Sequence, residues 1–158
     1  MKNMTLPAKS CSILLCALLL LAAGCKDQNQ PESFQDKGER PTWTAPEVSD
    51  MTSSMTAVIK VDLKAQYPNQ AADFVLDDND LLAAFSGDTC LGTAMPQEGL
   101  FFLYIGAPVT GTPSSVTLQY YSAHYKNLFE AKDAFPFQND AHLGTVAEPL
   151  APTFVVTK

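Results

Sequence analysis

An acidic segment in the middle of the chain carries the side chains best suited to hold a metal ion. Its four aspartates lie between positions 73 and 80, and they are Asp73, Asp77, Asp78 and Asp80. Calcium takes about six to eight oxygen ligands, and clustered aspartates in a loop can supply several of them. The glycine and distal glutamate of an EF-hand are missing here. The alternative interpretation is a solvated turn in which Asn79 or Asp80 caps backbone amides before a strand.

A second set of residues could be arranged for nucleophilic catalysis. The chain has two histidines, and Ser122 lies two positions before His124. A Ser122, His124 and Asp133 triad, or a Cys90 and His124 pair, would be the candidate hydrolase centres. The sequence has no nucleophile elbow, no recognisable oxyanion loop and no Gly-rich phosphate loop. We therefore expect a protein that is not an enzyme, with a Ser/Cys-His hydrolase as the weaker alternative.

Three aromatic residues are candidates for binding a ligand. Trp43 is the single tryptophan, and Tyr121 and Tyr125 lie in a segment dense in tyrosine and polar donors. Aromatic rings on an open face stack against sugar rings or contact protein partners, whereas rings on a closed face pack the core. Trp43 therefore has two interpretations, an exposed sugar platform and an anchor that pins the preceding segment onto the domain.

These residues must be positioned by strands, because the chain shows no convincing amphipathic helix of ten residues beyond its N-terminal leader. Apolar and polar residues alternate from 54 to 64, which predicts a strand with one face in water. Further strands are expected at 81–85, 90–94, 100–105, 116–121, 122–131, 135–137 and 154–157. The segment 100–105 is apolar on both faces, which indicates a central strand. Seven to eight short strands with turn signals predict an all-β protein, an antiparallel β-sandwich of immunoglobulin-like size.

The segment from Leu81 to Ala94 predicts a tight hairpin. Gly87 and Asp88 separate its two strands, and glycine supplies a positive φ without steric cost. Gly92 lies inside the second strand, which indicates a bulge or a close approach of another backbone.

The N-terminus has the features of an export leader. Lys2 and Lys9 precede an apolar run, Ile13–Leu21, that is shorter than the roughly 20 residues needed to span a bilayer. Small residues then lead to Gly24 and Cys25. This arrangement resembles the lipobox of bacterial lipoproteins, although Ala22 stands where that family more often has leucine. The resemblance implies cleavage between Gly24 and Cys25 and lipidation of Cys25, and the alternative is an ordinary secretory signal.

The residues after Cys25 predict a flexible tether. Positions 26–40 hold one aromatic, no aliphatic residue and many glutamines and acids, so they bury too little apolar area to offset their ordering entropy. We therefore divide the chain into a signal peptide at 1–24, a lipidated cysteine and tether at 25–42, and a β-sandwich domain at 43–158. Loss of the leader would also leave Cys90 as the one free thiol.

The charge balance excludes one class of partner. The whole chain has ten basic and 17 acidic residues, a formal charge of −7, and loss of Lys2 and Lys9 with the leader would make it −9. Phosphate backbones require clustered lysine and arginine, so no nucleic acid is expected as a partner.

Three segments together resemble a module of secreted and lipid-anchored proteins of Bacteroidota. They are Ser54–Ile59, Asp80–Phe85 and Gly87–Gly92, followed by an aromatic strand at Phe101–Ile105. In that module the second and third of these segments read Asn-Asp-Leu-x-Ala-Ala-Phe-x-Gly-Asp-x-Cys-x-Gly. The module usually has arginine where this chain has Leu91. The likeness covers roughly Trp43 to Phe154. It implies a β-rich domain in the cell envelope and no established activity.

These observations predict a lipid-anchored cell-envelope protein with a non-catalytic β-domain for binding, adhesion or assembly. The membrane is contacted through the lipid on Cys25, and the further partner is a glycan or an envelope protein. The location is the outer membrane, with the cell surface favoured over its periplasmic face because Lys26 and Asp27 resemble the start of a surface-export signal. The alternative is a calcium-stabilised carbohydrate-binding module, and calcium is the one cofactor that the acidic segment suggests.

Overall fold

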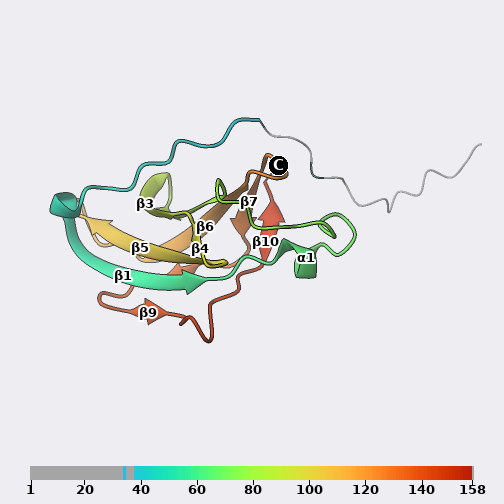
Figure 1. The fold of residues 1–158 in the computed structure, drawn as a ribbon. Helices are drawn as coiled ribbons and strands as arrows, with labels where there is room; N and C mark the ends of the chain where they lie inside the picture. The colour runs from blue at the N-terminus through green and yellow to red at the C-terminus, as the bar shows by residue number, and fades with distance from the viewer. Residues whose placement is uncertain (1–33, 35–37, 158) are drawn as a thin grey trace, which may run out of the picture. The chain divides into compact units, whose positions relative to one another are not determined.

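Strands make up most of the regular structure of the chain. The computed structural model describes Phe34 and residues 38–157. The elements in chain order are η1 (Val48–Asp50), β1 (Met51–Ile59), α1 (Leu63–Gln66), β2 (Leu81–Ser86), β3 (Thr89–Ala94), β4 (Pro96–Gln97), β5 (Leu100–Pro108), β6 (Ser115–Ser122), β7 (Asn127–Ala131), β8 (Phe135–Pro136), β9 (His142–Leu143) and β10 (Phe154–Val156). The predicted all-β class is confirmed, and Figure 1 shows α1 as a single short helical turn.

Two sheets pack face to face to form the predicted sandwich. Sheet A has the order β4-β5-β1-β9, and sheet B has the order β10-β7-β6-β2-β3, with β8 pairing with β6. All pairs are antiparallel except that of β1 with β9. The described strands exceed the seven or eight expected because β4 and β9, each only two residues long, were not predicted, whereas β8 corresponds to the edge strand expected at 135–137. Such short pieces leave no periodic signal in a sequence.

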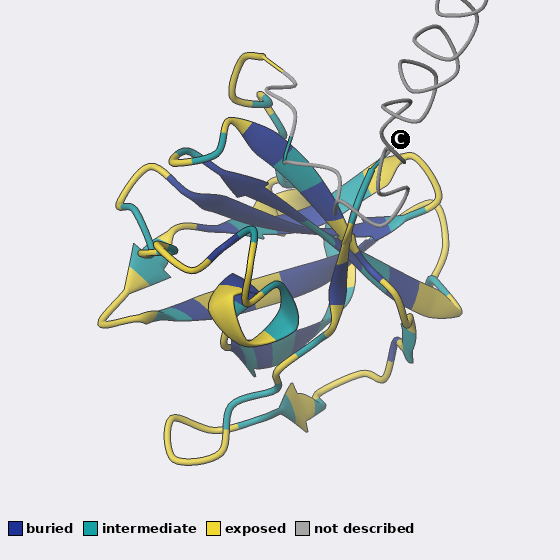
Figure 2. Cartoon of the chain, turned by 90° about the vertical axis from the view of Figure 1, so that its right-hand side faces the viewer, coloured by how far each residue is buried: buried dark blue, intermediate teal, exposed yellow. Residues whose placement is uncertain are grey.

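The core lies between the sheets and is built from one face of each strand. Fully buried aromatic rings meet there, with Tyr120 packed between Phe101, Phe129 and Phe154 at centroid distances of 5.7 to 5.9 Å. Figure 2 shows the buried residues, in dark blue, along the strands of both sheets and the exposed residues, in yellow, mostly on the loops. Alternation along β1 and β5 places every second residue in this core, as the period of an extended strand requires.

The hairpin of β2 and β3 forms as predicted. Gly87, at a φ of +56°, and Asp88 make the two-residue turn. The pairing register shifts between Ala84 and Phe85. Ala84 pairs with Gly92 and Phe85 with Cys90, so Leu91 has no partner on β2. Gly92 is also pressed against sheet A, because a Cβ at this position would overlap the backbone carbonyl oxygen of Tyr104 in β5. The close approach of another backbone to Gly92 is therefore confirmed, and the register shift lies directly beside Gly92.

Two local predictions were wrong. The segment 122–131 is not one continuing strand, because residues 123–126 form a hairpin turn that contains Lys126 at a positive φ of 47°. The first strand ends at Ile59 rather than Lys64. The last two residues of the expected strand, Leu63 and Lys64, instead begin α1, where the Asp62 carboxylate accepts a hydrogen bond from the amide of Ala65 at 3.0 Å.

The domain includes residues that the sequence assigned to the tether. The ring of Phe34 lies within 5.2 Å of the rings of Tyr67, Tyr125 and Phe129. Residues 38–47, the blue part of the trace in Figure 1, run along the sandwich to η1. We call residues 38–46 the N-terminal strap. The signal-peptide and lipidation predictions, Gly24 and Cys25 among them, lie outside the described residues.

Candidate functional site

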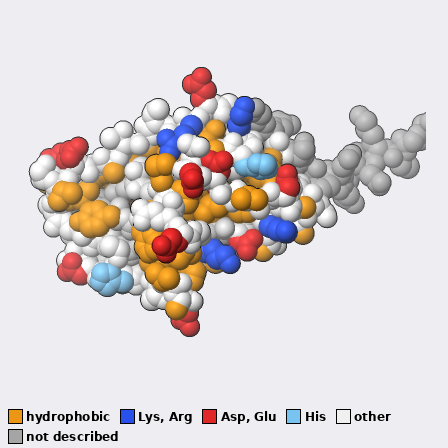
Figure 3. Space-filling model, in the orientation of Figure 1, with side chains coloured by type: hydrophobic (Ala, Val, Ile, Leu, Met, Phe, Trp, Pro, Cys, Tyr) orange, Lys and Arg blue, Asp and Glu red, His pale blue; other side chains and the backbone are white. Residues whose placement is uncertain are grey.

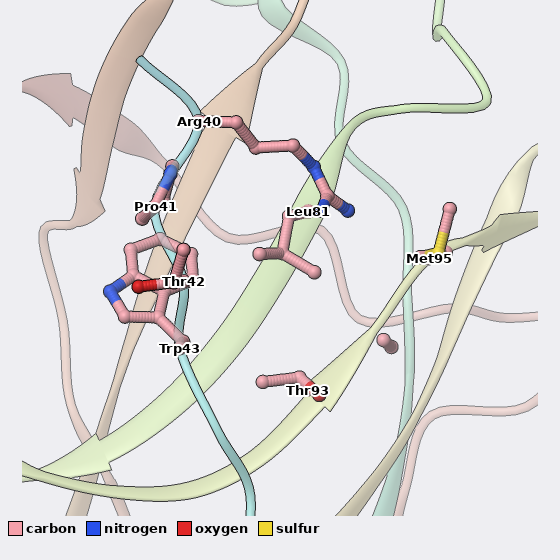
Figure 4. A pocket seen from close by; sticks show the side chains of 8 residues that line it. Arg40, Pro41, Thr42, Trp43, Leu81, Thr93 and Met95 are labelled. Carbon is pink, nitrogen blue, oxygen red and sulfur yellow. The ribbon is translucent and has the colours of Figure 1, made fainter.

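A concavity lies where the strap crosses the outer face of sheet B. This groove has a volume of about 550 Å³, which is within the range of pockets that hold small ligands. Its lining residues come from the strap, β2, β3 and the residue after β3, and they are Arg40, Pro41, Thr42, Trp43, Leu81, Thr93, Ala94 and Met95. Figure 4 shows Leu81 in the middle of the groove, between the Trp43 ring and Met95. We call it the Trp43 groove.

The sequence of β2 explains why the strap lies on this face. Leu82 and Ala84 point into the core, and Leu81, Ala83 and Phe85 point to the other side, yet all five are buried. A sheet face this apolar must be covered, and the strap covers it. Pro41 and Pro46 restrict the strap to an extended conformation, because proline fixes φ and disfavours the helical region for the residue before it.

Trp43 is both an anchor and a wall of the groove. Its ring meets Phe85 edge to face, with a centroid distance of 5.5 Å and an interplanar angle of 78°. The residue remains partly exposed, and its side chain lines the groove. The two interpretations drawn from the sequence therefore apply together, since one part of the indole holds the strap and another part is available to a ligand.

The polar groups of the groove are a guanidinium and two hydroxyls. The Nε of Arg40 donates to the carbonyl oxygen of Asn79 at 2.9 Å, which fixes the side chain. Within the described part of the chain, Arg40 has no ion-pair partner, and the Thr42 and Thr93 hydroxyls have no side-chain hydrogen bond. An aromatic wall beside hydrogen-bonding groups and one cation can hold a polar ring-shaped ligand such as a sugar.

Tyr121 lies near the end of β6 and Tyr125 in the turn that follows, and the two rings do not form one platform. Tyr121 lies on the outer face of sheet B but is buried, and its hydroxyl donates to the carbonyl oxygen of Gly38 at 3.3 Å. Tyr125 lies in the turn, stacks on Phe74 at 6.3 Å and contacts Phe34. The ring of Tyr121 is thus covered by the strap, while that of Tyr125 is part of an aromatic cluster at another place.

Three of the four candidate metal ligands use their carboxylates within the protein. Asp80 is fully buried and accepts hydrogen bonds from the Tyr120 hydroxyl at 2.5 Å, the Ala123 amide at 2.7 Å and the Asp77 amide at 3.1 Å. Asp77 accepts from the backbone and side-chain nitrogens of Asn79. This is the turn-capping arrangement that the sequence offered as the alternative to calcium.

The other two candidate ligands, Asp73 and Asp78, differ in their surroundings. Asp73 accepts from the Tyr125 hydroxyl at 2.8 Å and lies 3.3 Å from Nε2 of His124, whereas Asp78 is exposed. Among the residues that the structure describes, no three histidine, cysteine or acidic side chains are grouped so that they could hold a metal ion. The calcium hypothesis therefore gains no geometric support from this segment.

The pKa shifts follow from these contacts. The hydrogen bond from Tyr125, and then that from His124, lower the pKa of Asp73 below its ordinary value. Burial raises the pKa of Asp80 despite the hydrogen bonds that favour its charged form. Burial and the hydrogen bond to Asp73 likewise raise the pKa of the Tyr125 hydroxyl.

Ser122, His124 and Cys90, three of the suggested hydrolase residues, contact other neighbours in the described part of the chain. Ser122 is fully buried, and its hydroxyl accepts from the Tyr125 amide at 3.4 Å. His124 is exposed and bonded to Asp73. Cys90 is half-buried, and burial raises the pKa of its thiol, which disfavours the reactive thiolate. The described geometry thus provides no activated nucleophile at these positions.

Sequence reasoning missed an exposed aromatic pair on the outer face of sheet A. The segment 100–105 is central in its sheet, as predicted, since β5 lies between β4 and β1. However, Phe102 is 43% exposed and Tyr104 44% exposed, and Thr56 beside Tyr104 bonds to His142 Nδ1 at 2.6 Å. Figure 3 shows hydrophobic side chains, in orange, on the surface turned to the viewer of Figure 1. The alternation was visible in the sequence, but whether another layer covers this face was not.

No helix in the described residues is both long enough and apolar enough to cross a membrane.

Comparison with known proteins finds no match, since no family model, no curated protein and no solved structure is similar to this chain at a significant level.

Proposed function

We propose that this chain is a lipid-anchored cell-envelope protein whose β-sandwich binds a carbohydrate without chemically changing it. The observation that carries the proposal is the Trp43 groove. Its tryptophan is held in place by Phe85, and hydroxyl groups and a guanidinium border the same concavity. Carbohydrates combine apolar ring faces with many hydroxyls, so their binding requires this combination of an aromatic surface and polar groups.

The anchor is part of the same proposal. The short apolar run, the Gly24–Cys25 pair and the polar residues that follow support a lipid on Cys25. Each buried methylene contributes about 0.8 kcal/mol, so two or more acyl chains would hold the protein stably at a membrane. We place it at the outer membrane, with the cell surface favoured over the periplasmic face, where the groove would meet glycans of the envelope or its surroundings.

The test is a glycan array probed with the mature chain without lipid, Lys26–Lys158, which contains the whole described domain. Wild type should bind a restricted set of glycans, and Trp43→Ala should lose that binding. Phe102→Ser is the matched control, since it removes an exposed ring on the other sheet. Failure of wild type to bind any glycan would contradict carbohydrate binding.

A pull-down from the native envelope distinguishes this proposal from a role in assembly. Capture of an envelope protein that depends on Phe102 and Tyr104, with no array binding, would favour assembly through sheet A. Release of a shortened or de-esterified glycan during incubation would favour the hydrolase alternative.

A further inference from the structure

The guanidinium in the Trp43 groove is a cation that has no acidic partner among the described residues. In the described part of the chain Lys60 lies 3.9 Å from Asp62, whereas Lys64, Lys126 and Lys132 form no ion pair, so what distinguishes Arg40 is its place in the lining of the groove. Within the described residues, Arg40 instead bonds to a backbone carbonyl through its Nε and forms no ion pair.

The position of Arg40 directs its free N–H groups toward the groove. The bond from Nε to Asn79 fixes one edge of the planar guanidinium and leaves the two terminal nitrogens for another acceptor. Figure 4 shows the guanidinium immediately beside Leu81, which lies in the middle of the lining residues. A carboxylate accepts two parallel hydrogen bonds from such a fork, and charge-assisted bonds of this kind are about twice as strong as neutral ones.

We propose that the Trp43 groove selects saccharides that carry a carboxylate, with the carboxylate on the terminal nitrogens of Arg40 and the sugar ring against Trp43. This inference rests on the proposed function and specifies its substrate class. Thr42 and Thr93 lie within the same lining and supply hydroxyls for the neutral part of the sugar.

The charge of the domain limits the ligand further. One guanidinium can neutralise one carboxylate, and the formal charge, −7 for the whole chain and −9 without Lys2 and Lys9, repels a dense polyanion. The fitting ligand is therefore a glycan with isolated uronic or sialic acid residues rather than a heavily sulfated polymer.

The single tryptophan makes the test specific, because intrinsic indole fluorescence reports on this groove alone. The mature chain Lys26–Lys158 is titrated with methyl glucuronide and with methyl glucoside. These differ only at C6, which is a carboxylate in the first and a hydroxymethyl group in the second. It is also applied to an array that pairs acidic glycans with their neutral counterparts. Acidic members should bind tighter by about tenfold or more, the usual effect of a charge-assisted hydrogen bond.

Charge variants of the protein separate the guanidinium from general electrostatics. Arg40→Gln should remove the acidic preference, whereas Lys132→Gln changes the net charge equally at an exposed site and should retain it. Arg40→Lys keeps the charge but not the fork, and should restore part of the preference.

The outcomes distinguish the two proposals. Neutral glycans that bind as tightly as acidic ones, or an acidic preference unchanged in Arg40→Gln, would overturn this inference and leave the proposed function intact. Absence of binding to every glycan would overturn both.

Discussion

Replacement of Asp80 by alanine should destabilise the domain strongly, because this buried carboxylate joins three parts of the chain. It accepts hydrogen bonds from Tyr120 in β6, from Ala123 in the turn after β6 and from Asp77 in the loop before β2. Asp80 and Tyr120 are both fully buried. The substitution removes the acceptor for all three donors at once.

The expected loss of stability follows from the hydrogen bonds that the three donors lose. The Tyr120 hydroxyl has no access to water, and an orphaned buried donor costs about 1–3 kcal/mol. Ala123 and Asp77 are partly exposed, so their amides can form hydrogen bonds with water instead. Loss of each of these two bonds to Asp80 therefore costs about 0.5–1 kcal/mol. Relief of the buried charge offsets part of this sum. We therefore expect Asp80→Ala to lower the free energy of unfolding by about 2–4 kcal/mol.

Tyr120→Phe gives the matched comparison. It removes one donor and leaves Asp80 with two amide partners, so the expected cost is about 1 kcal/mol. In the double variant no hydroxyl is left without an acceptor, so its cost should be smaller than the sum of the two single costs.

The assay is urea denaturation of all four proteins at pH 7, followed by circular dichroism and evaluated as a double-mutant cycle. The reasoning would be refuted if Asp80→Ala were no more destabilising than Tyr120→Phe. Strict additivity of the two substitutions would refute it as well, because the two side chains would then not be coupled.

Three further predictions concern separate parts of the chain. Gly92→Ala should lower the free energy of unfolding by about 1–3 kcal/mol or more in the same assay, because the new Cβ overlaps the backbone of Tyr104, which cannot rotate away; an unchanged midpoint would contradict the close approach. Tyr125→Phe should raise the pKa of Asp73 toward its ordinary value in an NMR titration. Since the wild-type pKa is lowered, the stability difference caused by Tyr125→Phe should be present above about pH 4 and vanish as the pH falls through the folded pKa. Cys25→Ser should abolish labelling by a clickable fatty acid and leave the precursor uncut, and persistent labelling would place the anchor elsewhere.

The sequence was most informative where local patterns determine structure. The period of two along β1 and the Gly87–Asp88 turn predicted a strand and a hairpin that the structure confirms. Gly92 was identified because a glycine inside a strand usually marks a bulge or the close approach of another backbone. Each of these signals comes from neighbouring residues alone.

The sequence predictions were wrong where contacts between distant residues determine the local structure. Ser122–Ala131 has the composition of a strand, but the turn at 123–126 brings the Ala123 amide to Asp80, which is 43 positions earlier. The tether composition indicates no core, but Phe34 reaches an aromatic cluster formed by Tyr67, Tyr125 and Phe129. Contacts between such distant positions leave no periodic signal in the sequence.

The candidate site was predictable only in part. Trp43 was singled out because it is the one tryptophan, and Tyr121 because it lies among other tyrosines. The structure separates them, since the strap buries Tyr121 and leaves Trp43 partly exposed. Arg40 had no signal at all, because its role depends on the fold that brings it beside β2 and Asn79.

The most direct test of carbohydrate binding at the Trp43 groove is a titration followed by two-dimensional ¹H–¹⁵N NMR. The labelled mature chain is titrated with the glycan that binds best on the array. Binding at the groove predicts saturable shifts of the Trp43 indole N–H and of the Thr93 and Ala94 amides, with the Phe102 and Tyr104 amides unchanged. Shifts confined to Phe102 and Tyr104, with the Trp43 indole unmoved, would contradict the account.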